Sequence, residues 1–316
     1  MARCLMGERC CGVMKPNLEI MMNGQWWKNP VTTGSGTFSL EHSGAFYDVT
    51  RLGAATTKGV SWVPWPGNPM PRIAETYGGM LNSIGLQNNG VEEFVRGELV
   101  NLKNMGLPVV VNVVGKSREE YEKVVAYLNE TEADILEINL SCPNVREGGM
   151  AFGISPKETY EIATALRKLT RKPLYIKLSP NVTNIVAIAA KAEEAGADGL
   201  TMINTLLGMR IDVNTRKPVL GNIMGGLSGP CIKPVAVRMV YQVSREVRIP
   251  IIGGGGIYTG EDAAEFMMAG AKAVFVGSAA LMDPGAPIRI IEELENFMSG
   301  KGYENIDELR GSNHKK

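Results

Sequence analysis

The chain has 316 residues, of which 44% are hydrophobic, enough to bury a large core. Basic and acidic residues number 33 each, so no bulk charge would attract nucleic acid or an anionic membrane. No apolar run approaches the ~18 residues of a membrane-spanning helix. The start of the chain lacks the apolar core of a secretory signal, so we expect a cytoplasmic protein.

Five cysteines lie at scattered positions, and their odd number argues against a disulfide framework. Cys4, Cys10 and Cys11 have no fourth ligand at a spacing usual for zinc, so no metal site is predicted. They fall in residues 1–13, which we expect to be a disordered N-terminal extension. Only His42 and His314 are histidines, so proton chemistry must use Cys, Lys, Asp, Glu or Tyr.

Short apolar strands alternate with amphipathic helices along most of the chain, which predicts an α/β fold with a parallel sheet. Residues 61–90 are rich in Pro, Gly and Asn and predict a long excursion over the mouth of the fold. Ser155-Pro156-Lys157-Glu158 is a strong helix start. Eight strands are expected, at 29–35, 53–58, 109–112, 135–141, 174–178, 199–203, 250–252 and 273–276. Helices are expected at 91–105, from 117, at 155–170, through 190, at 233–247 and from 259.

About eight such repeats indicate a (β/α)8 TIM barrel, which residues 14–303 would form as a single domain. Residues 304–316 are then a polar C-terminal tail. A doubly wound open sheet is the alternative. The first strand, however, has no Gly-x-Gly-x-x-Gly entering a helix, as a dinucleotide-binding sheet of that kind would.

Polar residues and glycines recur where the predicted strands end. The carboxyl ends of barrel strands form the active face, so these side chains should meet in one site. Any one of them alone has an ordinary explanation as a turn cap or a solvated lysine, but the joint pattern is hard to dismiss. The positions are Ser35, Lys58, Asn112, Asn139, Lys177, Asn204, Thr205, Gly253–Gly256 and Gly277-Ser278.

The glycines after the last two strands predict a phosphate site built from backbone N–H groups, and hence a phosphorylated cofactor. Lys177 is flanked by apolar residues, and a buried ammonium needs a nearby anion. It could form a Schiff base, as in barrel aldolases, or stabilise negative charge on a cofactor ring. The amides at neighbouring strand ends favour a ring-binding redox site.

Cys142 follows the strand at 135–141 and is flanked by Asn139 and Asn144, while Pro143 ends the strand. In isolation, a Ser-Cys-Pro segment is more often a structural cysteine beside a turn. A thiol among amides at a strand mouth, however, suits a site that holds a polar planar molecule and moves one proton.

Four segments of the chain resemble the class 1 dihydroorotate dehydrogenases: 82–88 (NSIGLQN), 137–145 (EINLSCPNV), 177–181 (KLSPN) and 225–230 (GGLSGP). The resemblance covers roughly residues 17–299. Residues 148–153 (GGMAFG) resemble the class 1B catalytic subunit more than the fumarate-using class 1A homodimer. The resemblance implies a barrel with FMN at the C-terminal face of its strands, which oxidises (S)-dihydroorotate to orotate in UMP biosynthesis.

The resemblance also implies residue roles. Cys142 would take the C5 proton of the substrate while hydride passes from C6 to the flavin. Substrate would contact Lys58, Asn82, Ser83, Ile84, Gly85, Leu86, Asn139, Asn144, Asn204 and Thr205. FMN would contact Ser35, Thr57, Lys58, Asn112, Asn139, Lys177, Ile203, Gly229, Gly255, Gly256, Gly277 and Ser278.

Class 1B enzymes work with a second subunit that carries FAD and a [2Fe–2S] cluster and passes electrons to NAD+. The resemblance therefore implies a catalytic homodimer within a heterotetramer. Alternatives remain: use of fumarate in place of a partner, another dihydropyrimidine as substrate, FMN binding without catalysis, and a Schiff-base aldolase.

Overall fold

The computed structural model describes residues 15–140 and 153–314. Within these ranges, eight parallel strands form one sheet in the order β3-β16-β15-β10-β9-β8-β7-β4. Each lies where the sequence predicts a strand. Their bounds are β3 (Val31–Thr33), β4 (Ala55–Thr56), β7 (Val109–Val113), β8 (Ile135–Asn139), β9 (Leu174–Lys177), β10 (Gly199–Met202), β15 (Ile251–Gly253) and β16 (Ala273–Val276).

The two outer strands, β3 and β4, meet and close the sheet into a barrel. Thr32 pairs with Ala54 in a parallel bridge, and the Thr32 hydroxyl donates to the Ala54 carbonyl at 2.9 Å. The N–H of Gly53 donates to the carbonyl of Val31 at 3.0 Å. The (β/α)8 prediction is therefore confirmed, and the open-sheet alternative is wrong.

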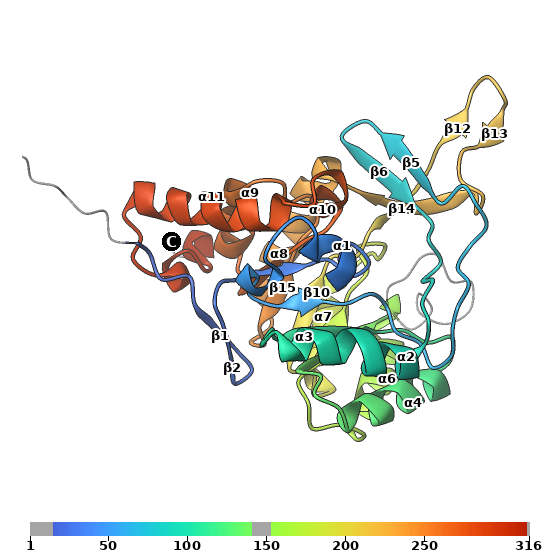
Figure 1. Ribbon diagram of the computed structural model, residues 1–316, viewed down its shortest axis with the longest axis horizontal. Coiled ribbons are helices and arrows are strands. Elements are labelled where there is room, and N and C mark those ends of the chain that lie inside the picture. The colour runs from blue at the N-terminus through green and yellow to red at the C-terminus, as the bar shows by residue number, and fades with distance from the viewer. Residues whose placement is uncertain (1–14, 141–152, 315–316) are drawn as a thin grey trace, which may run out of the picture.

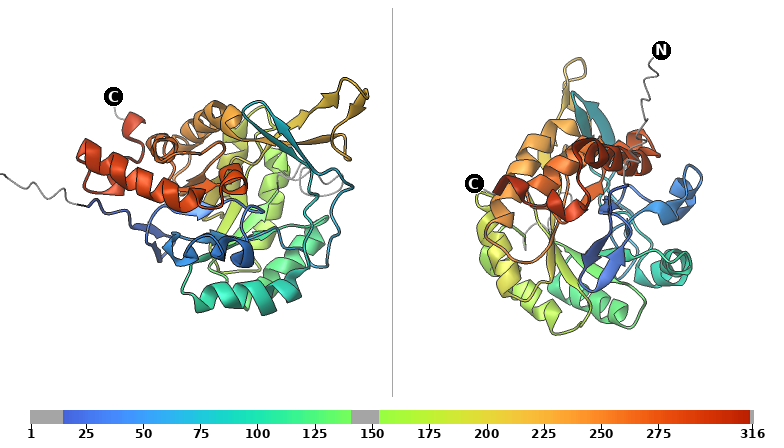
Figure 2. Two further views of the ribbon diagram at one scale, coloured as in Figure 1. Left: turned by 45° about the horizontal axis from the view of Figure 1, so that its top comes forward. Right: turned by 90° about the vertical axis from the view of Figure 1, so that its left-hand side faces the viewer.

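Helices surround the strands, as Figures 1 and 2 show. At the predicted start near 155, the Ser155 side chain accepts from the N–H of Glu158 and Pro156 occupies the first turn. The helix predicted at 91–105 is interrupted by a π-helical turn. The bounds are α2 (Val91–Phe94), the π turn (Val95–Leu99), α3 (Val100–Asn104), α4 (Arg118–Asn129), α6 (Pro156–Arg167), α7 (Ile185–Glu194), α8 (Lys233–Ser244), α9 (Gly260–Met268) and α11 (Ala286–Lys301).

The core lies between the strands and the inner faces of these helices. Val110, Leu136 and Ile176 are fully buried on adjacent strands, and Val240 and Phe266 are fully buried on α8 and α9, which pack against β15 and β16. Each side chain of this size contributes about 1.5–3 kcal/mol when it leaves water. The rigid barrel that results holds the carboxyl ends of its strands at fixed positions.

A second sheet rises from the active face and was not predicted. It joins the excursion at 61–90 to the glycine-rich stretch near 225 in the antiparallel order β11-β14-β6-β5. Figure 1 shows it projecting at the upper right, with the short hairpin β12–β13 beyond it. The bounds are β5 (Ile73–Thr76), β6 (Gly79–Asn82), β11 (Leu206–Met209), β12 (Ile211–Asp212), β13 (Lys217–Pro218) and β14 (Met224–Ser228).

Both ends of the described chain pack against the opposite end of the barrel. A hairpin of β1 (Ile20–Met22) and β2 (Gln25–Trp27) buries Trp27 completely. The C-terminal segment differs from the polar tail expected for 304–316, because Ile306 and Leu309 are fully buried. Among the described residues, no helix is both long and apolar enough to cross a membrane.

Candidate active site

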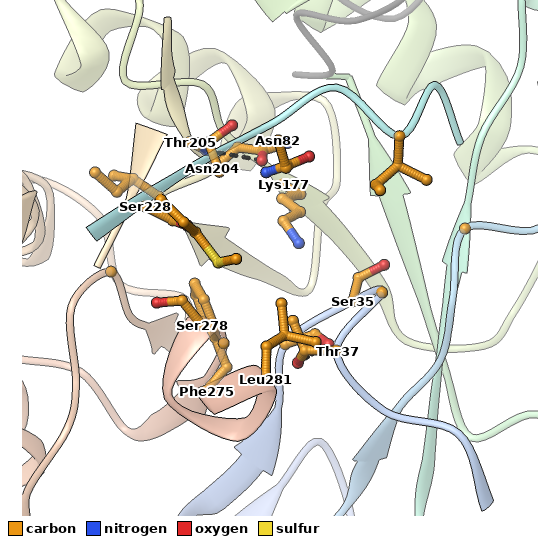
Figure 3. Close-up of a pocket in the computed structure, with 18 of the residues that line it drawn as sticks. Ser35, Thr37, Asn82, Lys177, Asn204, Thr205, Ser228, Phe275, Ser278 and Leu281 are labelled. Atoms are coloured by element: carbon orange, nitrogen blue, oxygen red, sulfur yellow. Dashed lines mark hydrogen bonds between the residues drawn. The ribbon is translucent and has the colours of Figure 1, made fainter. Parts of the chain in front are cut away.

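A cavity opens at the carboxyl ends of the barrel strands, with the second sheet as one wall. Figure 3 shows Asn82, Asn204 and Thr205 on one side of it and Ser278 and Leu281 on the other. The strand-end pattern therefore does converge on one site. The predicted residues that line the cavity are Ser35, Lys58, Asn82, Ile84, Gly85, Leu86, Asn139, Lys177, Ile203, Asn204, Thr205, Gly255, Gly256, Gly277 and Ser278.

Lys177, at the end of β9, points its ammonium into the space between these two sides (Figure 3). Its Nζ lies 3.4 Å from Glu137 Oε1, and the side chains of the two residues are only 7% and 1% exposed. Burying a lone ammonium would be costly, and this carboxylate offsets that cost. Lys177 Nζ also lies 5.5 Å from the centre of the Phe275 ring.

Glu137 is itself held by Asn112, whose Nδ2 donates to Glu137 Oε1 at 2.5 Å. The Oδ1 of the same Asn112 accepts from Asn139 Nδ2 at 3.3 Å. Three neighbouring strands, β7, β8 and β9, thus share one buried polar network. The network fixes Asn139 and Lys177 at the cavity wall, so a bound molecule meets polar groups that are already oriented.

Lys58 is a second cation on the cavity wall. Burial lowers the pKa of its ammonium, and the positive charge of Arg72 lowers it further. Within the described ranges, Lys58 has no ion-pair partner to offset that burial. An anionic or electron-rich ligand in the cavity would therefore gain from Lys58 without displacing a protein carboxylate.

The side chains of Asn82, Asn139, Asn204 and Thr205 form a polar cluster drawn from three separate segments. Asn204 Nδ2 donates to Asn139 Oδ1 at 3.4 Å, and Asn204 Oδ1 accepts from the N–H of Thr205 at 2.8 Å. Asn82, at the end of β6, donates to the carbonyl of Gly226 at 3.4 Å. Amides both donate and accept, so the cluster matches the edge of a planar polar ring.

The opposite side of the cavity is built from backbone. Gly255 and Gly256 have φ angles of 131° and 90°, and a Cβ on Gly256 would lie 2.7 Å from the carbonyl oxygen of Gly229. In the described part of the chain, their N–H groups have no hydrogen-bond partner. A Cβ on Gly277 would meet nothing closer than 4.0 Å, so the wall beside Ser278 is open. This glycine cradle suits a phosphate group.

Other predicted site residues lie behind the cavity wall. Ser83 and Thr57 are fully buried, and the Thr57 hydroxyl donates to the Lys58 carbonyl at 3.0 Å and accepts from the N–H of Asn112 at 3.3 Å. Gly229, with a φ of 119°, packs against Gly79. These residues support the wall, and none of them lines the cavity. The predicted base Cys142 and its neighbour Asn144 lie outside the described residues.

A family model described as dihydroorotate dehydrogenase matches residues 17–298. The chain belongs to the dihydroorotate dehydrogenase family. This agrees with the family to which four segments of the sequence pointed.

Curated relatives match this chain almost end to end. "Dihydroorotate dehydrogenase B (NAD(+)), catalytic subunit" of Alkaliphilus metalliredigens is 51% identical over 299 residues, which are 94% of this chain and 99% of the relative. The protein of the same name from Lachnoclostridium phytofermentans is 54% identical over 297 residues, 93% of this chain and 99% of that one.

A solved dihydroorotate dehydrogenase of Eimeria tenella, in complex with ferulenol, has a TM-score of 0.80 to this chain. It covers 95% of this chain and 89% of its own, at 23% identity. At that identity the likeness shows the fold alone, and it agrees with the barrel.

The sequence alone did not reveal part of the cavity wall. Glu137 could have been found from the sequence, because it is a charged residue inside the apolar run Ile135–Ile138. The apolar part of the wall could not, because it depends on the second sheet and on the α10 turn (Ser278–Met282). The other lining residues that were not predicted are Gly34, Gly36, Thr37, Gly59, Ile73, Met80, Ser228, Ile232, Ile257, Phe275 and Leu281.

Proposed function

We propose that this chain oxidises (S)-dihydroorotate to orotate, in de novo pyrimidine biosynthesis, with FMN bound in the cavity. One observation carries the proposal: an amide cluster, the buried Lys177, the half-buried Lys58 and a glycine cradle line a single cavity in a member of the dihydroorotate dehydrogenase family. The names of the relatives support the same substrate and an NAD+-linked oxidoreductase.

The cavity fits FMN at both of its ends. The free N–H groups of Gly255 and Gly256, with Gly277 and Ser278, would hold the phosphate. Lys177 would offset negative charge on the ring, since Glu137 holds its ammonium at the wall. When bound, FMN supplies a ring that accepts a hydride. The residues proposed to contact the flavin ring, or to support the cavity wall beside it, are Ser35, Thr57, Lys58, Asn112, Asn139, Ile203 and Gly229.

The amide cluster would bind the pyrimidine ring of the substrate. Asn82, Asn139 and Asn204 offer donors and acceptors to its carbonyl and N–H groups, and Thr205 adds a hydroxyl. Lys58 would lie between the substrate and the flavin. Further substrate contacts are proposed for Ser83, Ile84, Gly85, Leu86 and Asn144.

Cys142 is the proposed base for the C5 proton. It follows β8, the strand whose Glu137 and Asn139 belong to the buried network. A thiol has an ordinary pKa of about 8.5, so the thiolate fraction rises steeply from neutral to alkaline pH.

Electrons would leave through a second subunit that carries FAD and a [2Fe–2S] cluster, with NAD+ as the final acceptor. The words "NAD(+)" and "catalytic subunit" in the names of the relatives favour this arrangement over fumarate. The assembly proposed is a catalytic homodimer within a heterotetramer.

The test is an anaerobic titration of the purified, FMN-loaded chain with dihydroorotate. We expect the visible flavin band to bleach and one orotate to form per flavin. An oxidised flavin in the presence of excess dihydroorotate would refute the substrate. Adding fumarate to the reduced protein then tests the alternative acceptor, and reoxidation on the timescale of turnover would contradict the NAD+-linked assignment.

A further inference from the structure

A second cavity lies at the opposite end of the barrel from the candidate active site, and we call it the basal cavity. Its volume is about 350 Å³, and it lies where β15 and β16 begin. The same two strands end at the glycine cradle, so the two sites occupy opposite ends of one pair of strands. The basal cavity is lined by Ser244, Val247, Arg248, Ile249, Pro250, Ile251, Gly270, Lys272, Arg310 and Gly311.

Three cations line the basal cavity, namely Arg248, Lys272 and Arg310. They come from three separate segments: the loop after α8, the loop after α9 and the C-terminal segment. Over residues 15–140 and 153–314, none of their side chains has an ion-pair or hydrogen-bond partner. The chain as a whole has no net charge, so this local excess does not come from a basic surface.

Lys272 shows the electrostatic cost of this arrangement. Partial burial lowers the pKa of its ammonium, and the nearby Arg310 lowers it further, while Asp307 offsets part of that effect. Like charges held close together disfavour each other's charged form. The lining of the basal cavity therefore holds three cations and no acidic residue.

The carboxylates nearby, those of Glu193 and Asp307, do not line the cavity. Glu193 accepts from the N–H groups of Arg248 and Ile249, at 2.8 and 3.2 Å, so its carboxylate is already engaged. The C-termini of α8 and α9 also lie near and contribute about half a negative charge each. Arg248, Lys272 and Arg310 line the cavity and no acidic residue does, so the charged groups nearest to a bound molecule are cationic.

We propose that the basal cavity binds a phosphate group, carried by inorganic phosphate or by a small phosphorylated metabolite. The planar guanidinium groups of Arg248 and Arg310 can each donate two parallel hydrogen bonds to phosphate oxygens. The Lys272 ammonium adds a compact positive charge. The volume exceeds what one phosphate group needs, so the cavity has room for part of the molecule that carries it.

The competing explanation is that the cations only complement the helix C-termini. The two explanations predict opposite changes in the melting temperature when Lys272 is replaced. If the cluster serves a ligand, Lys272→Gln relieves repulsion and raises the melting temperature in phosphate-free buffer. If the cluster serves the helices, the same substitution lowers it, and that result would overturn the proposal.

The binding experiment uses the FMN-loaded protein, so that the glycine cradle is filled. Inorganic phosphate, a nucleoside monophosphate and the parent nucleoside are titrated by calorimetry at constant ionic strength. We expect saturable binding of one or both phosphorylated probes and none of the nucleoside. The stronger of the two phosphorylated probes identifies the source of the phosphate. Saturable binding of neither overturns the proposal.

A variant series ties that binding to the basal cavity. Lys272→Gln with Arg310→Gln should weaken binding at least tenfold. Arg245→Gln is the matched control, because Arg245 is an exposed arginine at the end of α8 that donates to Tyr241 and does not line the cavity. Equal binding by the double variant and the parent would place the phosphate elsewhere and overturn the assignment. If phosphate instead binds at a glycine cradle that has lost its FMN, its affinity will likewise be the same in the double variant and the parent.

Discussion

The carboxylate of Glu137 allows the ammonium of Lys177 to be buried inside the barrel. The pair is almost fully buried, and Asn112 donates a further hydrogen bond to the carboxylate. We expect Glu137→Gln to lower the free energy of unfolding by about 3 kcal/mol, because it leaves an uncompensated buried charge. Urea unfolding of the FMN-free protein measures this.

The matched control removes both charges. Glu137→Gln combined with Lys177→Met should recover part of the loss, since no unpaired ion remains in the core. A double variant less stable than the single one would contradict the ion-pair account and assign the loss to packing.

Replacing Lys58 should have the opposite effect on the free energy of unfolding. Its pKa is lowered by burial, so its charged form costs folding free energy at every pH below that pKa. The cost disappears as the pH rises past the unfolded value of about 10.4. We therefore expect Lys58→Met to be more stable than the parent by about 1 kcal/mol at pH 7, a gain of the size common at functional sites.

The stability gain of Lys58→Met should shrink as the pH approaches 10, and flavin reduction by dihydroorotate should slow about 100-fold. Thermal unfolding at pH 7 to 10 measures the stability change, and stopped-flow absorbance measures the rate of flavin reduction. A variant that is destabilised at pH 7 would show that Lys58 serves the fold rather than a ligand.

Cys142 is tested by its pH profile. The rate of flavin reduction should rise through a pKa near the ordinary thiol value of about 8.5. Cys142→Ala should reduce the rate at least 100-fold, the lower end of what a positioned general base contributes. Retention of full turnover by this variant would refute the proposed base.

At the scale of elements, what the sequence predicted well was local. The predicted helix starts at Ser155-Pro156 and at Thr259, where Asp262 completes a capping box, each lie within one turn of chain, so local propensity determines them. The second sheet was missed because β6 pairs with β14, and Asn82 lies opposite Gly226 across 144 residues of chain. A polar, glycine-rich composition gives no signal for a partner so distant.

The glycine loop after β15 is an element whose geometry can be tested. Gly256 has a φ of 90°, and a Cβ there would lie 2.7 Å from the Gly229 carbonyl oxygen. We expect Gly256→Ala to move this loop and weaken FMN binding at least tenfold, measured by flavin fluorescence. Gly302→Ala is the control, because it has a φ of 76° but nothing within 4 Å. Equal FMN affinity in both variants would contradict a cradle at Gly256.

At the scale of the whole molecule, the second sheet also exposes several large apolar side chains. Ile73, Tyr77, Met209 and Met224 are 51%, 103%, 46% and 47% exposed on its strands and turns. Clusters of this kind mark association surfaces on proteins. Ile73, Met209 and Met224 lie on the same face of this sheet as Asn82 and Ser228, which line the cavity. Whatever covers this face therefore also bears on one wall of the active site.

We expect a second copy of the chain to cover this face, in keeping with the proposed catalytic homodimer. Tyr77→Asp with Met209→Asp should raise the dimer dissociation constant at least 100-fold, because both replacements bury a charge in an apolar contact. Light scattering after gel filtration measures the mass of each variant. Trp26→Asp is the control, since Trp26 is 67% exposed on β2, near the opposite end of the barrel. If Trp26→Asp dissociates the dimer and the double variant does not, the contact lies at the hairpin of β1 and β2 instead.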